Sequence, residues 1–165
     1  MKIGIIADTH DNIYAIRQAV CFFNTQNLKY VIHAGDYIAP FSLKELMNVK
    51  SKFLGVFGNN DGERKGLLAV CKDIHEPPYD FILDGKHIMV THMIESLSKR
   101  SIVNTDIIVS AHTHTPEIKQ GNPMYINPGE CGGWLHDKST VAILDVKTFH
   151  AEIVDLSTVS LGKGY

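Results

Sequence analysis

The 165-residue sequence has few cysteines and no long hydrophobic run. Its three cysteines, Cys21, Cys71 and Cys131, are widely spaced without a CxxC pair, which favours free thiols over a disulfide framework. The longest apolar stretches have strand length, well short of the roughly 20 residues of a membrane-spanning helix. Because Met1 and Lys2 lead directly into a predicted strand rather than a signal peptide, we expect a cytoplasmic protein without a membrane partner.

Charge of one sign is not in excess, since the formal net charge is −2 and no run of five like charges occurs. The sequence therefore has no basic segment of the kind that binds duplex nucleic acid. A P-loop, linkers, repeats and low-complexity tracts are also lacking, apart from a polar tail. With 44% hydrophobic and 21% charged residues, we expect one domain over residues 1–165, with a disordered tail from about residue 157.

The first half of the sequence alternates between apolar strand patterns and helical patterns. Asp11 and Asn12 are candidate caps for a helix that begins near Ile13, and Pro40 opens a second helix over 40–47. Continuous apolar strands joined by helices indicate a parallel sheet covered on both faces. The predicted strands are residues 2–7, 29–34 and 52–57.

The second half is predicted to be mostly antiparallel. Residues 80–92 are typical of two strands joined at Asp84-Gly85, and residues 140–155 are typical of a hairpin that turns near Lys147-Thr148. We also predict strands at 106–111 and 124–128 and a helix near 94–103.

Seven polar side chains follow five of the predicted strands. Ligands of open α/β sheets collect outside the carboxyl ends of the strands, so these side chains are expected to converge. Carboxylate, imidazole and amide groups without a thiolate suit Mn²⁺, Fe²⁺, Co²⁺, Ni²⁺ or Zn²⁺, and seven ligands are too many for one ion. The seven are Asp8, His10, Asp36, Asn59, His92, His112 and His114.

Each of these residues, taken alone, has a structural explanation. An Asp after a strand is often a cap, Gly-Asp and Gly-Asn are common turn dipeptides, and a lone histidine is more often structural than a ligand. The combination of five strand ends favours a metal site. The remaining strand-associated histidines lack partner motifs and are expected to be structural: His33, His75, His87 and His150.

The motifs D-x-H, G-D, G-N-x-D, T-H and H-x-H occur here at residues 8–10, 35–36, 58–61, 91–92 and 112–114. In this order they resemble the calcineurin-like metallophosphoesterases over nearly the whole chain. The segment 126–133 is similar to that of the small YfcE-type archaeal and bacterial phosphodiesterases. The resemblance implies an α/β fold, a four-layer α/β/β/α sandwich with two mixed sheets, and a metal-dependent phosphodiesterase acting on a small phosphoester.

The resemblance also implies the ligand sets of a dinuclear centre. One ion would be held by Asp8, His10 and His114, the second by Asn59, His92 and His112, with Asp36 as the bridge. Two ions roughly 3.5–4 Å apart activate a bridging hydroxide for in-line attack on phosphorus, and Asp36, Asn59 and His92 would act through it. Mn²⁺ is the expected ion, with Ni, Co, Fe and Zn as alternatives, and the pattern is compatible with a homo-oligomer.

Asn60 departs from the family pattern, because many larger relatives have a histidine there that is thought to protonate the leaving group. An amide cannot be a general acid, so no clear general acid is present and activated esters are the expected substrates. Other departures are Met93-Ile94 after T-H and Ala111 before H-x-H.

Four further residues have candidate roles, each with an alternative. His136 is a candidate proton donor or an inert loop residue, and Trp134 would stack on a base or aryl group or else pack at the core or a subunit contact. Asp61 and Glu130 are candidates for orienting the ligating histidines.

Two non-enzymatic functions remain alternatives. The first is a scaffold: a retromer subunit resembles these enzymes but serves mainly as a protein-binding platform. The second is a metal-dependent regulatory subunit. The scaffold has a degraded ligand set, whereas all seven positions are intact here, which favours the enzyme.

Overall fold

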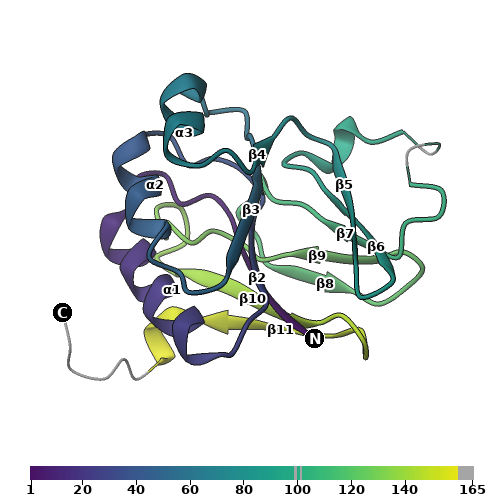
Figure 1. Cartoon of the computed structure of the whole chain (residues 1–165). Coiled ribbons are helices and arrows are strands. Elements are labelled where there is room, and N and C mark those ends of the chain that lie inside the picture. The colour runs from purple at the N-terminus through teal and green to yellow at the C-terminus, as the bar shows by residue number, and fades with distance from the viewer. Residues whose placement is uncertain (99, 101, 160–165) are drawn as a thin grey trace.

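The computed structural model of the chain describes residues 1–98, 100 and 102–159. Two mixed β-sheets pack face to face, and three helices cover the outer face of the first sheet (Figure 1). The helices are α1 (Ile13–Thr25), α2 (Pro40–Leu46) and α3 (Arg64–Val70). This confirms the predicted α/β fold with two mixed sheets.

The first sheet has the strand order β11-β10-β1-β2-β3-β4. Strands β1 to β4 are parallel, β10 is antiparallel to β1, and β11 is antiparallel to β10. Its strands are β1 (Lys2–Ile6), β2 (Tyr30–His33), β3 (Lys52–Val56), β4 (Ile74–His75), β10 (Thr140–Asp145) and β11 (His150–Asp155).

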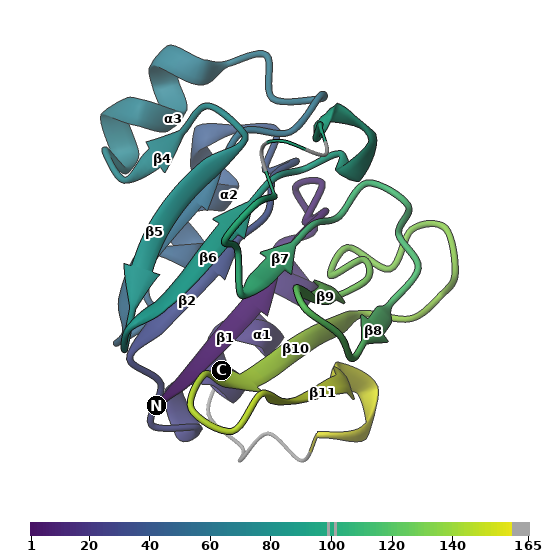
Figure 2. The same cartoon turned by 90° about the vertical axis from the view of Figure 1, so that its right-hand side faces the viewer.

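The second sheet has the order β5-β6-β7-β9-β8 and faces the viewer in Figure 2. Strands β6, β7 and β9 are parallel, with an antiparallel strand at each edge. Its strands are β5 (Tyr79–Leu83), β6 (Lys86–Val90), β7 (Ile107–Val109), β8 (Glu117–Lys119) and β9 (Met124–Asn127).

Hydrophobic clusters lie on both faces of the first sheet because successive side chains of a strand point to opposite faces. Ile6 of β1 belongs to the cluster under the helices, with Phe23 and Leu43. Its neighbour Ile5 belongs to the cluster between the sheets, with Val109 of β7. Both faces of β1 are therefore buried beyond its first residue, and its carboxyl end leads to the buried polar residues Asp8 and Thr9.

The start of α1 differs in detail from the prediction. Asn12 is the N-cap, and its side chain accepts a hydrogen bond from the Ala15 N–H (3.2 Å). Asp11 instead accepts from the Ala39 N–H (3.0 Å) and the Ser42 hydroxyl (2.6 Å) at the start of α2. Asp11 therefore ties the loop after β1 to the second helix.

The helix expected near 94–103 is present among the described residues only as the 3₁₀ helix η1 (Ile94–Ser96). Ser96 and Thr91 both donate hydroxyl hydrogen bonds to the Met93 carbonyl (2.7 and 3.2 Å), which competes with helical pairing. Helix α3 and strand β4 were not predicted from the sequence.

The chain after β11 continues into the 3₁₀ helix η2 (Leu156–Thr158), in which Leu156 is buried. The tail expected to be disordered from about residue 157 thus begins in an ordered turn, and residues 160–165 lie outside the described part. Three free cysteines agree with the sequence analysis. Within the described ranges, no helix has the length and apolar character needed to cross a bilayer.

Candidate metal centre

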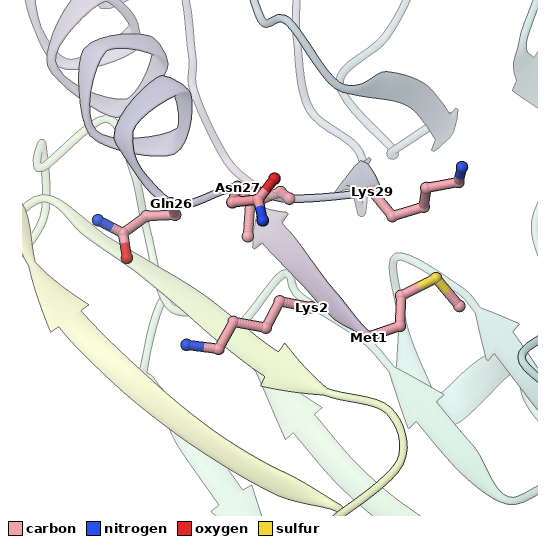
Figure 3. A pocket seen from close by; sticks show the side chains of 6 residues that line it. Met1, Lys2, Gln26, Asn27 and Lys29 are labelled. Atoms are coloured by element: carbon pink, nitrogen blue, oxygen red, sulfur yellow. The ribbon is translucent and has the colours of Figure 1, made fainter.

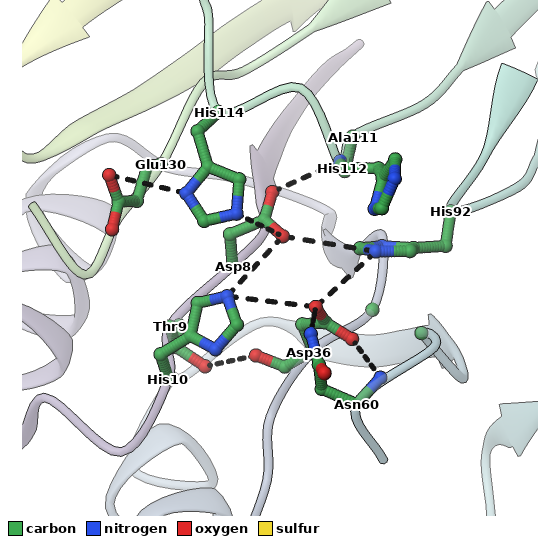
Figure 4. A network of polar contacts seen from close by, with 12 residues as sticks. Asp8, Thr9, His10, Asp36, Asn60, His92, Ala111, His112, His114 and Glu130 are labelled. Atoms are coloured by element: carbon green, nitrogen blue, oxygen red, sulfur yellow. Dashed lines mark hydrogen bonds and ion pairs between the residues drawn. The ribbon is translucent and has the colours of Figure 1, made fainter. Parts of the chain in front are cut away.

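Loops that follow five strands meet at one edge of the two sheets (Figure 4). Asp8 and His10 follow β1, Asp36 follows β2, Asn59 follows β3, His92 follows β6, and His112 and His114 follow β7. Side chains at strand ends therefore converge across both sheets, although the strands that carry them are spread over much of the sequence.

An unusual backbone conformation recurs in these loops. Five candidate ligands have φ between 40° and 70°, in the left-handed region that side chains other than glycine rarely adopt. Such conformations cluster at functional sites because the surrounding structure must hold them in place. The five residues are Asp8, His10, Asp36, His112 and His114.

Two buried carboxylates form the centre of the cluster. Oδ1 of Asp8 lies 3.5 Å from His114 Nε2, 3.8 Å from His10 Nε2 and 3.9 Å from His92 Nε2. Oδ2 of Asp36 lies 3.6 Å from His10 Nε2 and 3.4 Å from His92 Nε2. Asp36 therefore reaches one histidine on each side of the cluster.

Three of these atoms are buried without a hydrogen-bond partner among the described residues: Asp8 Oδ1, His10 Nε2 and His92 Nε2. An unsatisfied buried polar group costs about 1–3 kcal/mol, so three of them pointing at one another need an explanation. The ligand atoms of Asp8, His10 and His114 lie within 4.8 Å of one another, as do those of Asp8, Asp36 and His92. Carboxylate and imidazole groups in this arrangement fit divalent cations.

The histidines form two pairs on opposite sides of the carboxylates. The rings of His10 and His114 are stacked, with centroids 5.2 Å apart and planes at 27°. The rings of His92 and His112 meet edge to face, also at 5.2 Å, with planes at 70°. His112 is exposed, and its backbone N–H donates to Asp8 Oδ2 at 3.3 Å.

The amide that contacts the cluster belongs to Asn60. Its Nδ2 donates to Asp36 Oδ2 (2.7 Å) and its backbone N–H donates to Asp36 Oδ1 (2.8 Å). Asn59, the predicted ligand, is exposed and lines a neighbouring cavity together with His92. Asn60 thus fixes the orientation of Asp36, a role that its position in the motif did not indicate.

Protein oxygen atoms lie behind two of the histidines, on the side away from the cluster. The Ala34 carbonyl lies 2.8 Å from His92 Nδ1, and Glu130 Oε2 lies 3.3 Å from His114 Nδ1. Since a carbonyl only accepts, Nδ1 of His92 carries the proton and its Nε2 presents a lone pair to the cluster, whereas Nδ1 of His114 makes no hydrogen bond among the described residues.

Glu130 is a buried carboxylate that joins the site to the loop after β9. Besides lying against His114, it accepts hydrogen bonds from the backbone N–H groups of Trp134 (2.7 Å) and Leu135 (3.1 Å). It lies next to the ring of His114 without a hydrogen bond to Nδ1, so its role in orienting that histidine stays a prediction.

Asp61 acts on the backbone instead of on a histidine. Its carboxylate accepts hydrogen bonds from four N–H groups and so joins the loops after β2 and β3. The donors are Asp36 (3.0 Å), Tyr37 (2.7 Å), Ile38 (2.9 Å) and Gly58 (2.7 Å).

His33, expected to be structural, is buried beneath the site. Its Nδ1 accepts from the Gly35 N–H (3.1 Å), so its Nε2–H donates to the Thr9 hydroxyl (3.2 Å), which in turn donates to the Asp36 carbonyl (3.3 Å). Burial holds the pKa of His33 well below its usual range, so the ring stays neutral and keeps these contacts.

The two carboxylates differ in their affinity for protons. Burial raises the pKa of Asp8 to about 6, although His92 and His114 oppose the shift. For Asp36, burial also favours the neutral acid, but the neighbouring His92 imidazole and the hydrogen bonds from Asn60 outweigh it and hold its pKa far below the usual range. Both carboxylates are therefore ionised at neutral pH and available to a cation.

Two cavities at the surface differ in the side chains that line them. A cavity of about 200 Å³ adjoins the cluster through His92 and Asn59 and includes Arg64, whose Nη1 binds Glu76 at 2.6 Å. A larger groove of about 510 Å³ lies at the start of β1 and is lined by Met1, Lys2, Gln26, Asn27, Leu28 and Lys29 (Figure 3). That groove has no carboxylate or imidazole side chain in its lining, whereas the cavity beside His92 adjoins the cluster.

Two sheets thus gather carboxylates and imidazoles at their strand ends, in groups that could hold divalent cations. The sequence matches the family described as the calcineurin-like phosphoesterase superfamily domain over residues 1–149. It is 39% identical to a protein named phosphodiesterase MJ0936 from Methanocaldococcus jannaschii, covering 93% of this chain and 99% of the relative. The chain therefore belongs to the calcineurin-like phosphoesterase superfamily, which confirms the predicted family and enzyme class.

Several solved structures have a fold similar to that of this chain. One described as a novel archaeal phosphodiesterase has a TM-score of 0.86 at 32% identity and covers 94% of this chain and 99% of its own. The phosphoesterase YfcE from E. coli has a TM-score of 0.71 at 19% identity, over 94% and 100% of the two chains. Vps29 from Entamoeba histolytica, complexed with Zn²⁺, has a TM-score of 0.65 at 18% identity, over 94% and 99%. The last two likenesses concern the fold alone.

Proposed function

We propose that the protein is a phosphodiesterase with a dinuclear metal centre. The observation that carries the proposal is the position of Asp36 Oδ2, which lies within 3.6 Å of both His10 Nε2 and His92 Nε2 and so can serve an ion on each side. The likeness to a protein named phosphodiesterase supports the substrate class. The proposed ligands remain Asp8, His10, Asp36, Asn59, His92, His112 and His114.

Two bound divalent ions would supply a hydroxide at neutral pH and stabilise charge on the phosphoryl oxygens. The chain's own residues prepare the site for them. The Ala34 carbonyl keeps the proton of His92 on Nδ1, the Glu130 carboxylate lies 3.3 Å behind His114, and Asn60 holds Asp36 in place through two hydrogen bonds. Since Asn60 donates to Asp36 and cannot protonate a leaving group, we propose that substrates with good leaving groups are preferred.

Finer properties belong to the same proposal. Mn²⁺ is the proposed ion, because the candidate ligands are oxygen and imidazole nitrogen without thiolate, and Ni, Co, Fe and Zn are alternatives. A small phosphoester is the proposed substrate, and the cytoplasm is the proposed location, in keeping with three free cysteines.

The test is to purify the protein metal-free, reload it with single divalent ions, and assay aryl phosphodiesters, cyclic nucleotides and phosphomonoesters. We expect about two equivalents of bound metal and highest turnover of aryl diesters. Preferred turnover of a sugar monophosphate would contradict the proposed preference. Full metal binding without turnover across the whole panel would instead favour the second candidate, a protein-binding scaffold or regulatory subunit on this fold.

A further inference from the structure

Trp134 is an exposed aromatic residue held beside the candidate metal centre. It is the only tryptophan of the chain, and 63% of it is exposed. Its indole Nε1–H donates to the carbonyl of His10 (3.2 Å), and its backbone N–H donates to Glu130 (2.7 Å). Because the indole N–H and the backbone N–H are both hydrogen-bonded, the side chain of Trp134 is fixed in place while a large apolar area of its ring stays exposed to solvent.

The loop that carries Trp134 is attached to the loop after β1. The N–H groups of Cys131 and Gly132 donate to the carbonyls of Ala7 (3.0 Å) and Asp8 (2.9 Å), and Asn12 Nδ2 donates to the Gly132 carbonyl (2.7 Å). The position of the indole therefore follows that of Asp8 and His10.

Gly132 determines how closely the indole approaches. A Cβ at this position would lie 2.9 Å from Trp134 Cδ1 and 3.0 Å from the Asp8 carbonyl oxygen. One edge of the indole therefore packs against the glycine backbone next to the site, and only a residue without a side chain permits this.

A phosphodiester has two ester groups, which leave the phosphorus in different directions. A cavity adjoins the candidate site on the side of His92 and Asn59, and on the side of His10 the indole of Trp134 contacts the His10 backbone carbonyl. A phosphate bound at the cluster would thus direct one ester group into the cavity and the other along the exposed indole.

We propose that Trp134 is a specificity-determining residue that stacks on a planar aromatic ester group of the substrate, an aryl ring or a nucleobase. The proposal rests on the proposed phosphodiesterase function. Stacking of a base on an aromatic side chain strengthens binding roughly tenfold, and it tolerates different rings because each has a π face. The neighbouring Leu135 is exposed to a similar extent, 66%, but has no aromatic ring, so it serves as the matched control.

Because Trp134 is the only tryptophan, its fluorescence reports binding directly, without turnover. Metal-loaded protein is titrated with phenyl phosphate, AMP and inorganic phosphate, and metal-free protein is titrated in parallel. We expect quenching by phenyl phosphate and AMP in the metal-loaded protein only, and no quenching by inorganic phosphate. A larger effect of AMP would identify a nucleobase as the preferred ring, and equal effects would identify aromatic groups in general. Equal responses to all three ligands would overturn the proposal.

Kinetics provide a second readout. Trp134→Ala is expected to raise KM for bis(p-nitrophenyl) phosphate roughly tenfold, with a smaller effect on kcat, and Trp134→Phe to restore most of the loss. Leu135→Ala should leave both constants unchanged. If Trp134→Ala leaves KM unchanged but converts an oligomer to a monomer in sedimentation velocity, the indole is a subunit contact and the proposal is wrong. Absence of turnover in the wild type together with ring-specific quenching would refute the proposed hydrolysis but not the stacking.

Discussion

The two histidine pairs of the candidate centre differ in how completely the fold holds them. In the His10–His114 pair both side chains are mostly buried, at 19% and 13% exposure, and Glu130 lies behind His114. In the other pair, His92 is only 2% exposed, but His112 is exposed. We call the His10–His114 side of the centre its first half and the His92–His112 side its second half. The first half is thus arranged before an ion binds, whereas the second depends on one buried histidine and on ligands in exposed loops.

This difference predicts unequal affinities, since a preorganised site binds with less loss of conformational freedom. We expect the ion of the His10–His114 half to bind more tightly.

Removal of the shared carboxylate should have the largest effect. Asp36→Ala is expected to lose both ions and all measurable activity, because Asp36 contacts a histidine of each half. Metal content by elemental analysis after reloading is the measurement, and Asp36→Asn is the control that keeps the volume of the side chain. Retention of the full metal content by Asp36→Ala would refute the bridging assignment.

Substitution of one histidine from each pair compares the halves directly. His114→Ala should remove the tightly held ion, whereas His112→Ala should retain about one equivalent of metal, because His114 contacts Asp8 and Glu130 and His112 is exposed. Calorimetric titration with Mn²⁺ would resolve the two affinities. If the ions that the two variants retain bind Mn²⁺ with the same affinity, the two halves are equivalent.

Glu130→Gln should weaken the first half without removing a ligand. Loss of an outer carboxylate that orients a ligating histidine typically lowers metal affinity or activity about 10–100-fold. The glutamine keeps one carbonyl oxygen as an acceptor for the loop at Trp134 and Leu135. The same titration measures the effect, and a loss confined to the weaker ion would contradict the arrangement.

Acidification should release metal through Asp8. Its pKa, raised by burial to about 6, means that protons compete with the ions below that pH. We expect the metal affinity to fall about tenfold per pH unit below pH 6 and to change little above pH 7. In the metal-free protein the ionised, buried carboxylate is unfavourable above pH 6, so added metal should raise Tm more at neutral pH than at pH 5. A Tm increase independent of pH would contradict this.

The smallest expected effect concerns Asn60. Asn60→Ala removes one side-chain hydrogen bond to an ionised carboxylate, worth about 1.5–3 kcal/mol, but keeps the backbone N–H bond to Asp36. We expect roughly a tenfold loss of activity, with both ions retained. Asn59→Ala is the paired variant and should lower occupancy of the second half. The opposite result, metal loss in Asn60→Ala alone, would exchange the roles of the two asparagines.

Most of the site follows from the sequence because strand ends are recognisable. Apolar runs end abruptly at Asp8 and at His92, and parallel strands bring such ends together. The ordinary helical spacing after Asn12 likewise predicted α1.

The remainder depends on loops in which periodicity carries no information. Asn59 and Asn60 are adjacent, and only the turn that they occupy determines which amide faces Asp36. Asp61 binds backbone amides, and no sequence pattern distinguishes that role from contact with a histidine. The prediction of a helix near 94–103 was wrong beyond the short 3₁₀ helix η1, because hydroxyl side chains compete for the Met93 carbonyl.

The single carboxylate of Asp61 makes two loops into one cooperative unit. Its four amide partners, on residues 36, 37, 38 and 58, lie on separate segments but share one acceptor group. Hydrogen exchange at these amides should therefore occur in concert, with one common opening free energy rather than four local ones. The loop that positions Asp36 cannot open alone, and its lifetime is linked to that of the loop after β3.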